Sequence, residues 1–169
     1  MVRTQHSFDH TAGAVWSLMC NSQMEDSASL LFKLGVPKPI QCRVTDNRPG
    51  VGSERECVSD QGVVRQRILV WAPAKCLSFR MESTDMPFRK HVRDLVDTFD
   101  LESARGGVVV TRTTQVWTQG RFQFVERFAL YISLKKVHRF VFGNWERLAN
   151  QGATSSASLE SGSPPTPAA

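Results

Sequence analysis

Apolar and polar residues alternate in short segments over most of the first 116 residues of the chain. Alternation places every second side chain on the same face, which is the pattern of a half-buried β-strand. Asp60-Gln61-Gly62 and Gly106-Gly107 separate neighbouring segments as tight turns do. The pattern therefore predicts an antiparallel sheet of about seven strands, at residues 2–8, 40–44, 53–59, 64–70, 77–81, 95–101 and 108–116.

Helical spacing of apolar residues replaces alternation in three segments. Residues 12–21 and 27–34 are short, and Gly35 and Pro37 end the second of them. Residues 124–149 are predicted to form a long helix. Its broad apolar face consists of Leu130, Tyr131, Leu134, Val137, His138, Val141, Trp145 and Leu148. The order of elements indicates an α+β fold, with two short helices after the first strand and a curved sheet wrapped around the C-terminal helix.

The same patterns predict which side chains form the core between sheet and helix. The expected set is Ile40, Val44, Ile68, Leu77, Phe79, Leu95, Phe99, Val110, Leu134 and Val141. Three further apolar residues of the long helix, Phe128, Ile132 and Phe140, fall outside its apolar face. We expect either that loops cover them or that they form a patch for a second copy, which makes a homodimer possible.

Composition adds limits to this picture. The 169 residues are 41% hydrophobic and 22% charged, as in ordinary globular proteins. The formal net charge of +5 comes from scattered basic residues, so we expect no nucleic-acid partner. Residues 151–169 are rich in Ser, Pro, Gly and Ala, and we predict a disordered tail there. The expected domain is residues 1–150.

Neither a leader nor a membrane-spanning segment is expected, because no long apolar run occurs. The four cysteines, Cys20, Cys42, Cys57 and Cys76, form no Cys-x-x-Cys pair. We therefore expect buried reduced thiols and a cytoplasmic location.

No motif for catalysis or cofactor binding is visible. The four histidines are dispersed along the chain, and no cluster of histidine and cysteine residues indicates a metal site. There is no Gly-x-Ser-x-Gly motif and no glycine-rich phosphate loop between a strand and a helix. We expect no metal and no cofactor, and the sequence identifies no catalytic residue.

Polar residues interrupt the inward faces of the predicted strands at Arg55, Gln66, Arg93, Asp97 and Arg112. A buried charge is costly without a partner, so these side chains must meet each other, water or a ligand. Arg112 and Asp97, on adjacent strands, form either a structural ion pair or part of a ligand site. Tyr131 and His138, seven residues apart on the helix, either bond a ligand or belong to the core. The six candidate cavity residues are Arg55, Gln66, Asp97, Arg112, Tyr131 and His138.

Several short motifs occur in a recognisable order. They are Val15-Trp16, Gly52-x-x-Arg55, Gly62 four residues before Gln66, Ile68-x-x-Trp71-x-Pro73-x-x-x-Leu77, and Gly106-Gly107. In this order and spacing the chain resembles the START-like, or SRPBCC, superfamily with its helix-grip fold. It is most similar to the polyketide cyclase/dehydrase and lipid-transport branch. The resemblance covers nearly all of residues 2–149. The chain departs from many relatives at Gln66, where they carry Glu, so a charged partner for Arg55 is missing.

The resemblance implies a cavity between sheet and helix for a hydrophobic small molecule, such as a lipid, a polyketide or an aromatic compound. We expect binding or transport of such a molecule first. A cyclase/dehydrase-type enzyme that uses the same cavity is the first alternative, and a protein-interaction module is the second. Because one fold hosts many functions, the resemblance alone does not decide among the three.

Overall fold

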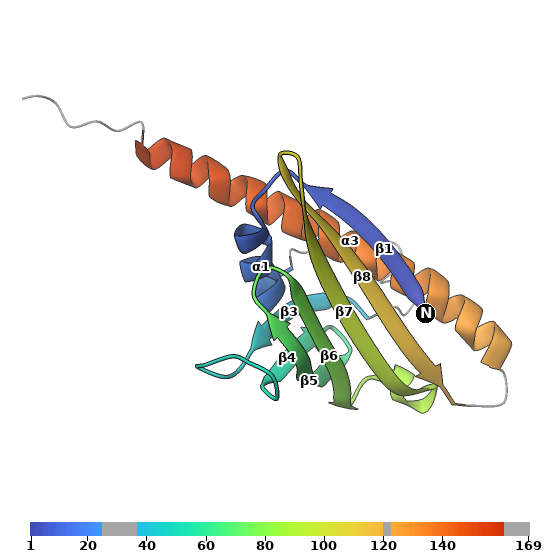
Figure 1. Cartoon of the computed structure of the whole chain (residues 1–169). Helices are drawn as coiled ribbons and strands as arrows, with labels where there is room; N and C mark the ends of the chain where they lie inside the picture. Colours follow the sequence, from blue (N-terminus) through green and yellow to red (C-terminus); the bar gives the residue numbers. More distant parts are fainter. Residues whose placement is uncertain (25–36, 120–122, 161–169) are drawn as a thin grey trace, which may run out of the picture.

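A computed structural model describes residues 1–24, 37–119 and 123–160 of the chain. The short helix predicted at residues 27–34 lies outside the described residues. All seven predicted strands are present, and the expected curved antiparallel sheet with a long helix against it is confirmed (Figure 1).

One sheet contains every described strand, in the order β1-β8-β7-β6-β5-β4-β3-β2. Its strands are β1 (Val2–Phe8), β2 (Asn21–Gln23), β3 (Pro39–Val44), β4 (Glu54–Ser59), β5 (Gly62–Ala72), β6 (Cys76–Thr84), β7 (Val92–Ala104) and β8 (Gly107–Thr118). The three-residue strand β2, which was not predicted, adds an edge beside β3. All neighbouring pairs are antiparallel. The first strand, β1, forms one edge of the sheet and pairs with the last strand, β8.

The helices are α1 (Ala12–Cys20), the 3-10 helix η1 (Pro87–Lys90) and α3 (Gln123–Glu160). Thr11 caps α1, because its hydroxyl accepts a hydrogen bond from the Ala14 N–H at 3.3 Å. The predicted end of the long helix at residue 149 is wrong, since α3 continues to Glu160. Extending an existing helix costs less than nucleating one, and the Ala- and Ser-containing sequence after Asn150 holds no proline before Pro164. The expected domain boundary therefore falls inside a helix.

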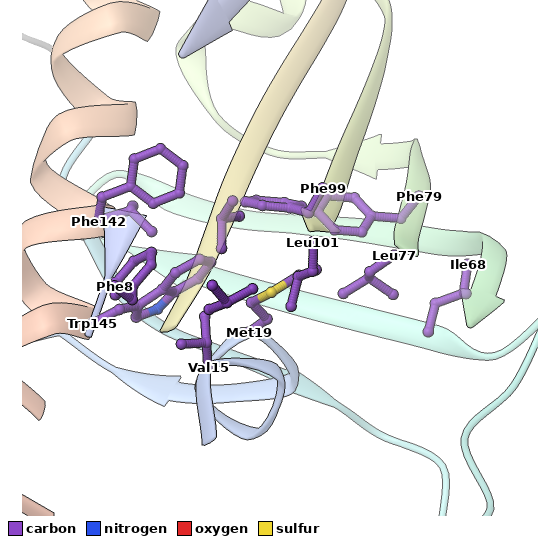
Figure 2. Close-up of a cluster of buried hydrophobic side chains, with 13 residues drawn as sticks. Phe8, Val15, Met19, Ile68, Leu77, Phe79, Phe99, Leu101, Phe142 and Trp145 are labelled. Carbon is purple, nitrogen blue, oxygen red and sulfur yellow. The ribbon is translucent and has the colours of Figure 1, made fainter. Parts of the chain in front are cut away.

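Side chains from α1, α3 and the inner face of the sheet meet in a buried cluster (Figure 2). α1 contributes Val15 and Met19, and α3 contributes Phe142 and Trp145. The Phe142 ring packs edge-on against Phe8 of β1, with centroids 6.0 Å apart. Of the predicted core set, Ile68, Leu77, Phe79, Phe99, Val110 and Val141 are buried, whereas Val44, Leu95 and Leu134 are half-buried.

Arg93, expected on the inner face, is exposed at a pairing irregularity between Val92 and Asp94 of β7. Ile40, expected to face inward, and Val70, which alternation places on the same face as Ile68, are exposed as well. Ile40 is 44% exposed and Val70 is 41% exposed. Both lie beside irregularities in strand pairing, between Pro39 and Gln41 in β3 and between Ile68 and Val70 in β5. An inserted residue breaks the period of two, so alternation predicted the wrong face beyond each irregularity.

The expectation that all cysteines are reduced is also wrong for two of them. Cys42 of β3 and Cys57 of β4 form a disulfide, whereas Cys20 and Cys76 are free. Cys42 and Cys57 are directly opposite each other, with Cα atoms 4.2 Å apart. Strand register creates this proximity across 15 positions of sequence, so a search for local cysteine motifs could not detect it.

Part of α3 keeps apolar side chains at the surface of the described structure. Phe128 is 67% exposed and Ile132 is 38% exposed, while Phe140 packs against the core. No helix in the described part of the chain combines the length and apolar character needed to cross a membrane.

Candidate ligand-binding cavity

A cavity of about 320 Å³ lies between α3 and the inner face of the sheet. The helix lines it with Leu130, Ser133, Leu134, Val137, Val141 and Trp145. These positions repeat at three- and four-residue intervals, so a single face of α3 forms that wall. Leu95 and Val92 of β7, with Val116 of β8, are among the apolar residues on the opposite wall. The volume is in the range of small-molecule sites in proteins.

Most described lining residues are apolar, and the charged ones among them are Arg55, Asp97 and Arg112. Gln66 also lines the cavity, so four of the six residues chosen from the sequence surround one space. Alternation along β4, β5, β7 and β8 directs these side chains inward, as the sequence pattern predicted. An apolar cavity with a few convergent polar groups is the usual form of a ligand site.

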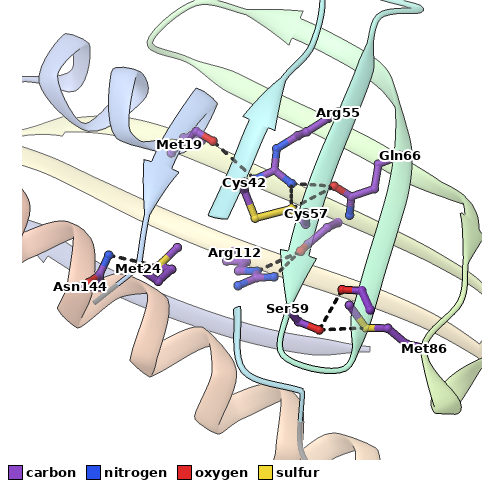
Figure 3. Close-up of a disulfide and its surroundings, with 12 residues drawn as sticks. Met19, Met24, Cys42, Arg55, Cys57, Ser59, Gln66, Met86, Arg112 and Asn144 are labelled. Atoms are coloured by element: carbon purple, nitrogen blue, oxygen red, sulfur yellow. Dashed lines mark hydrogen bonds and ion pairs between the residues drawn. A yellow bond between two sulfur atoms is a disulfide. The ribbon is translucent and has the colours of Figure 1, made fainter. Parts of the chain in front are cut away.

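Arg55 is buried in the wall of this cavity, at 4% exposure. Its Nη1 donates to Gln66 Oε1 at 2.6 Å, directly across the β4–β5 pair, and contacts Cys57 Sγ at 2.7 Å (Figure 3). Its Nη2 lies 3.5 Å from the Met19 carbonyl oxygen, and its Nε has no hydrogen-bond partner. The guanidinium stacks over the Phe79 ring at 4.3 Å. No described carboxylate forms an ion pair with it.

Burial is the main influence on the Arg55 charge. It lowers the pKa of the guanidinium to about 10, a change that the Asp97 carboxylate opposes and the Arg112 charge reinforces. Arg55 thus stays protonated at neutral pH in a site that disfavours its charge. The neutral Gln66 gives it a hydrogen bond but no compensating charge.

Arg112 is the opposite case, because a carboxylate neutralises it. Its Nε donates to Asp97 Oδ2 at 3.0 Å and its Nη2 donates to the same oxygen at 2.5 Å. Asp97 Oδ1 accepts a further bond from the Thr114 hydroxyl at 2.7 Å. The ion pair suggested by the positions of Arg112 and Asp97 in the sequence is therefore present, and the Asp97 oxygens are occupied by protein donors.

His138 lies one layer behind the cavity wall and is fully buried. Its Nε2 is 2.8 Å from the Thr114 hydroxyl, and its Nδ1 is 3.0 Å from the Thr4 hydroxyl. Because Thr114 gives its own proton to Asp97, it must accept from His138 Nε2–H. Nδ1 of the neutral ring is then the acceptor of the Thr4 proton. Burial, reinforced by the Arg112 charge, lowers the His138 pKa to about 3, against the opposing effect of Asp97.

This chain of hydrogen bonds ties α3 to β1, β7 and β8 through polar contacts. The sequence left two roles open for His138, and the structure shows that it is a core residue that does not reach the cavity surface.

Tyr131 was expected at the cavity, and that expectation is wrong. Its side chain is 40% exposed and its ring lies under the Lys135 ammonium group, 5.0 Å away. Its neighbour Leu130 does line the cavity. The predicted apolar face of α3 was therefore too broad to show which of its residues border the cavity.

Two cavity features were not identified from the sequence. Thr114 lines the wall and connects Asp97 to His138. The Cys42–Cys57 disulfide also borders the cavity. Met86, directly before η1, is 5% exposed and lines the cavity too. The inward position of Thr114 was visible in the alternation of β8, but its hydrogen-bond partners depend on register.

In the described residues, no three His, Cys, Asp or Glu side chains gather where they could hold a metal ion.

No protein-family model matches the chain, and no curated protein matches it either. Solved structures, in contrast, share its architecture over almost the whole length.

Three of these structures illustrate the likeness. The ginseng major latex-like protein 151 from Panax ginseng has a TM-score of 0.62 at 9% identity, over 88% of this chain and 95% of that chain. Protein MLL2253 from Mesorhizobium loti has a TM-score of 0.61 at 20% identity, over 89% and 96%. Ara h 8.0201 has a TM-score of 0.60 at 14% identity, over 88% and 96%.

The chain has the START-like, or SRPBCC, fold. The long helix against a curved antiparallel sheet is the arrangement that the sequence motifs indicated. The cavity lies between the sheet and the long helix of this fold. At these low identities the likeness establishes the fold and leaves ligand and reaction undetermined.

Proposed function

We propose that this protein binds or carries a hydrophobic small molecule in the cavity between α3 and the sheet. A lipid, a polyketide or an aromatic compound is the expected class of ligand. The observation that carries the proposal is the cavity of about 320 Å³, whose described walls are mostly apolar and whose polar groups converge on one region. Burial of apolar ligand surface, at about 25 cal/mol per Å², supplies the binding free energy.

A cavity-filling variant tests this function directly. Ser133 lines the cavity from α3, so Ser133→Trp places an indole ring where the ligand would lie. Ser83→Trp is the matched control, because Ser83 is exposed on β6. We expect a neutral hydrophobic dye to bind the wild type and Ser83→Trp and to lose at least about tenfold in affinity with Ser133→Trp. Equal dye binding by all three proteins would contradict the proposal.

Native mass spectrometry of freshly purified protein is the complementary experiment. A ligand retained from the expression host would appear as a defined mass increment on the folded protein. Its accurate mass would separate a lipid from an aromatic compound, and Ser133→Trp should lack the increment.

A polyketide cyclase/dehydrase-type activity remains the alternative prediction. The titratable side chains of the described cavity wall are Arg55, Asp97 and Arg112, apart from the disulfide cysteines. Asp97 already accepts four hydrogen-bonding contacts, three from Arg112 and one from Thr114, which leaves it poorly placed to take a substrate proton. Binding without turnover is therefore the function we favour. The homodimer, the interaction-module role and the 1–150 domain boundary stay predictions.

The cytoplasmic location stays a prediction as well. The Cys42–Cys57 disulfide is more typical of an oxidising compartment, so it argues against that location.

A further inference from the structure

The charges of the cavity wall do not balance. Among its described lining residues, Arg55 and Arg112 are cationic and Asp97 is anionic, which leaves one positive charge without a counter-charge. Arg112 holds Asp97 in an ion pair, so the unmatched charge belongs to Arg55. A buried guanidinium without a carboxylate is an uncommon and costly arrangement.

The local contacts of Arg55 satisfy its hydrogen bonds only in part. Gln66 accepts one strong bond, the Met19 carbonyl is distant at 3.5 Å, and Nε is buried with no acceptor. Phe79 covers one face of the guanidinium, at 4.3 Å, which favours a cation without neutralising it. The side chain thus retains donor capacity inside a space large enough for a ligand.

We infer that the ligand of this cavity is an amphipathic monoanion whose carboxylate binds Arg55. This inference rests on the proposed function and specifies its ligand class. A single negative charge matches the single unmatched positive charge, whereas a dianionic phosphate monoester would leave an excess negative charge in a buried site. Planar guanidinium also matches the geometry of a carboxylate.

The position of Arg55 also orients the ligand. Arg55 contacts Phe79 of the buried cluster, so the carboxylate lies at the end of the cavity next to the packed core. The apolar body then extends along α3 past Leu134 towards Leu130. At about 30 Å³ for each water-sized group, a volume of about 320 Å³ holds about ten such groups. A carboxylic acid with about ten carbon atoms is therefore a suitable probe.

Decanoate, 1-decanol and decyl phosphate separate charge from apolar burial, because all three share the same chain. Their affinities are measured by displacement of a neutral hydrophobic dye at pH 7.5. For the wild type we expect decanoate to bind at least about tenfold more tightly than 1-decanol, the difference typical of a charged hydrogen-bonded pair. Decyl phosphate should bind more weakly than decanoate.

Arg55→Met tests the residue itself, since it keeps a long apolar side chain and removes the charge. The preference for decanoate over 1-decanol should disappear, while 1-decanol affinity stays within about threefold of wild type. Arg3→Met, at an exposed position of β1, is the matched control and should keep the preference. Without ligand, Arg55→Met should melt at the same temperature as the wild type or higher, because an unpaired buried charge is removed.

A measurement on the wild type keeps the inference testable if Arg55→Met does not fold. Decanoate labelled with ¹³C at its carboxyl carbon reports its own ionisation by NMR. A neighbouring buried cation should lower the pKa of the bound carboxyl group below that of free decanoate. A raised pKa would overturn the inference.

The outcomes separate the two proposals. Equal affinity for decanoate and 1-decanol in the wild type would overturn the anionic ligand and leave the apolar carrier intact. Loss of the decanoate preference in Arg112→Met but not in Arg55→Met would overturn the role of Arg55. Failure of all three probes to displace a dye that does bind would overturn the carboxylate inference alone. Failure of the wild type to bind the dye or any probe would count against the proposed function itself.

Discussion

Around Phe142 the space between α3 and the sheet is filled with side chains, whereas around Leu134 the same space is a cavity. Phe142 is 1% exposed and packs against Phe8 and Trp145, with ring centroids 6.0 and 5.9 Å away. Leu134, eight residues earlier on the same helix, is half-buried and borders the cavity. One continuous helix therefore serves two purposes along its length.

The difference shows how a fold can keep a cavity without losing its stability. Close packing at the core end supplies hydrophobic and dispersion energy that the cavity end lacks. α1 reinforces the core end, where Val15 and Met19 join the buried cluster. The cavity end is held by other means, namely the disulfide between β3 and β4 and the polar chain through His138.

Replacement of an α3 side chain by alanine should lower the free energy of unfolding far more at the core end than at the cavity end. We expect Phe142→Ala to lower the free energy of unfolding by about 3–5 kcal/mol, because it leaves a void among well-packed rings. Leu134→Ala should cost about 1 kcal/mol, since its side chain already faces open space. Denaturant unfolding monitored by circular dichroism measures both. Equal losses would mean that the two ends do not differ in packing.

Removal of the disulfide should weaken the cavity end by a comparable amount. Cys42 and Cys57 are separated by 15 positions, and closing a loop of that length contributes about 3 kcal/mol to stability. The double variant Cys42→Ser/Cys57→Ser should therefore unfold at lower denaturant concentration than the wild type under non-reducing conditions. Cys20→Ser is the control, because Cys20 is free. No shift in the double variant would show that the covalent bond does not stabilise this end.

Acid should loosen the polar connection between helix and sheet. His138 has a native pKa of about 3, below its usual value of 6.5, so the unfolded chain binds a proton between these values and the folded protein does not. The contribution of neutral His138 to the free energy of unfolding is complete above pH 6.5. It is lost as pH falls towards 3, at about 1.4 kcal/mol per pH unit. Unfolding of wild type and His138→Asn at pH 5, 6 and 7 isolates this slope. Parallel curves for the two proteins would contradict it.

The part of α3 beyond the core should contribute least. Gln151 and Gly152 are exposed, in contrast to Phe142 and Trp145. Deletion of residues 151–169 should therefore change the melting temperature by no more than about a degree. Differential scanning calorimetry of the full-length and shortened proteins is the measurement, and a fall of several degrees would assign this segment to the domain.

Much of this architecture was predictable because it depends on local periodicity. Alternation in β7 placed Asp97 and Phe99 on one inward face, and the helical spacing in α3 placed Leu134 and Val141 on another. Chemistry at single positions was also predictable, since an inward charge such as Arg55 or Arg112 must meet a partner or a ligand. The sequence thus determined the fold and four residues of the cavity wall.

Register and helix packing decided the rest, because they bring together residues that are far apart along the chain. The pairing of β3 with β4 joined Cys42 to Cys57, and irregular pairing turned Ile40 and Val70 outward. The rotation of α3 against the sheet placed His138 behind Thr114 and left Tyr131 outside. Packing also made Thr114 the further donor to Asp97, and it left the Nε of Arg55 without an acceptor. Each such pairing depends on which of several competing long-range contacts is the most stable. Local sequence patterns carry no information about that relative stability.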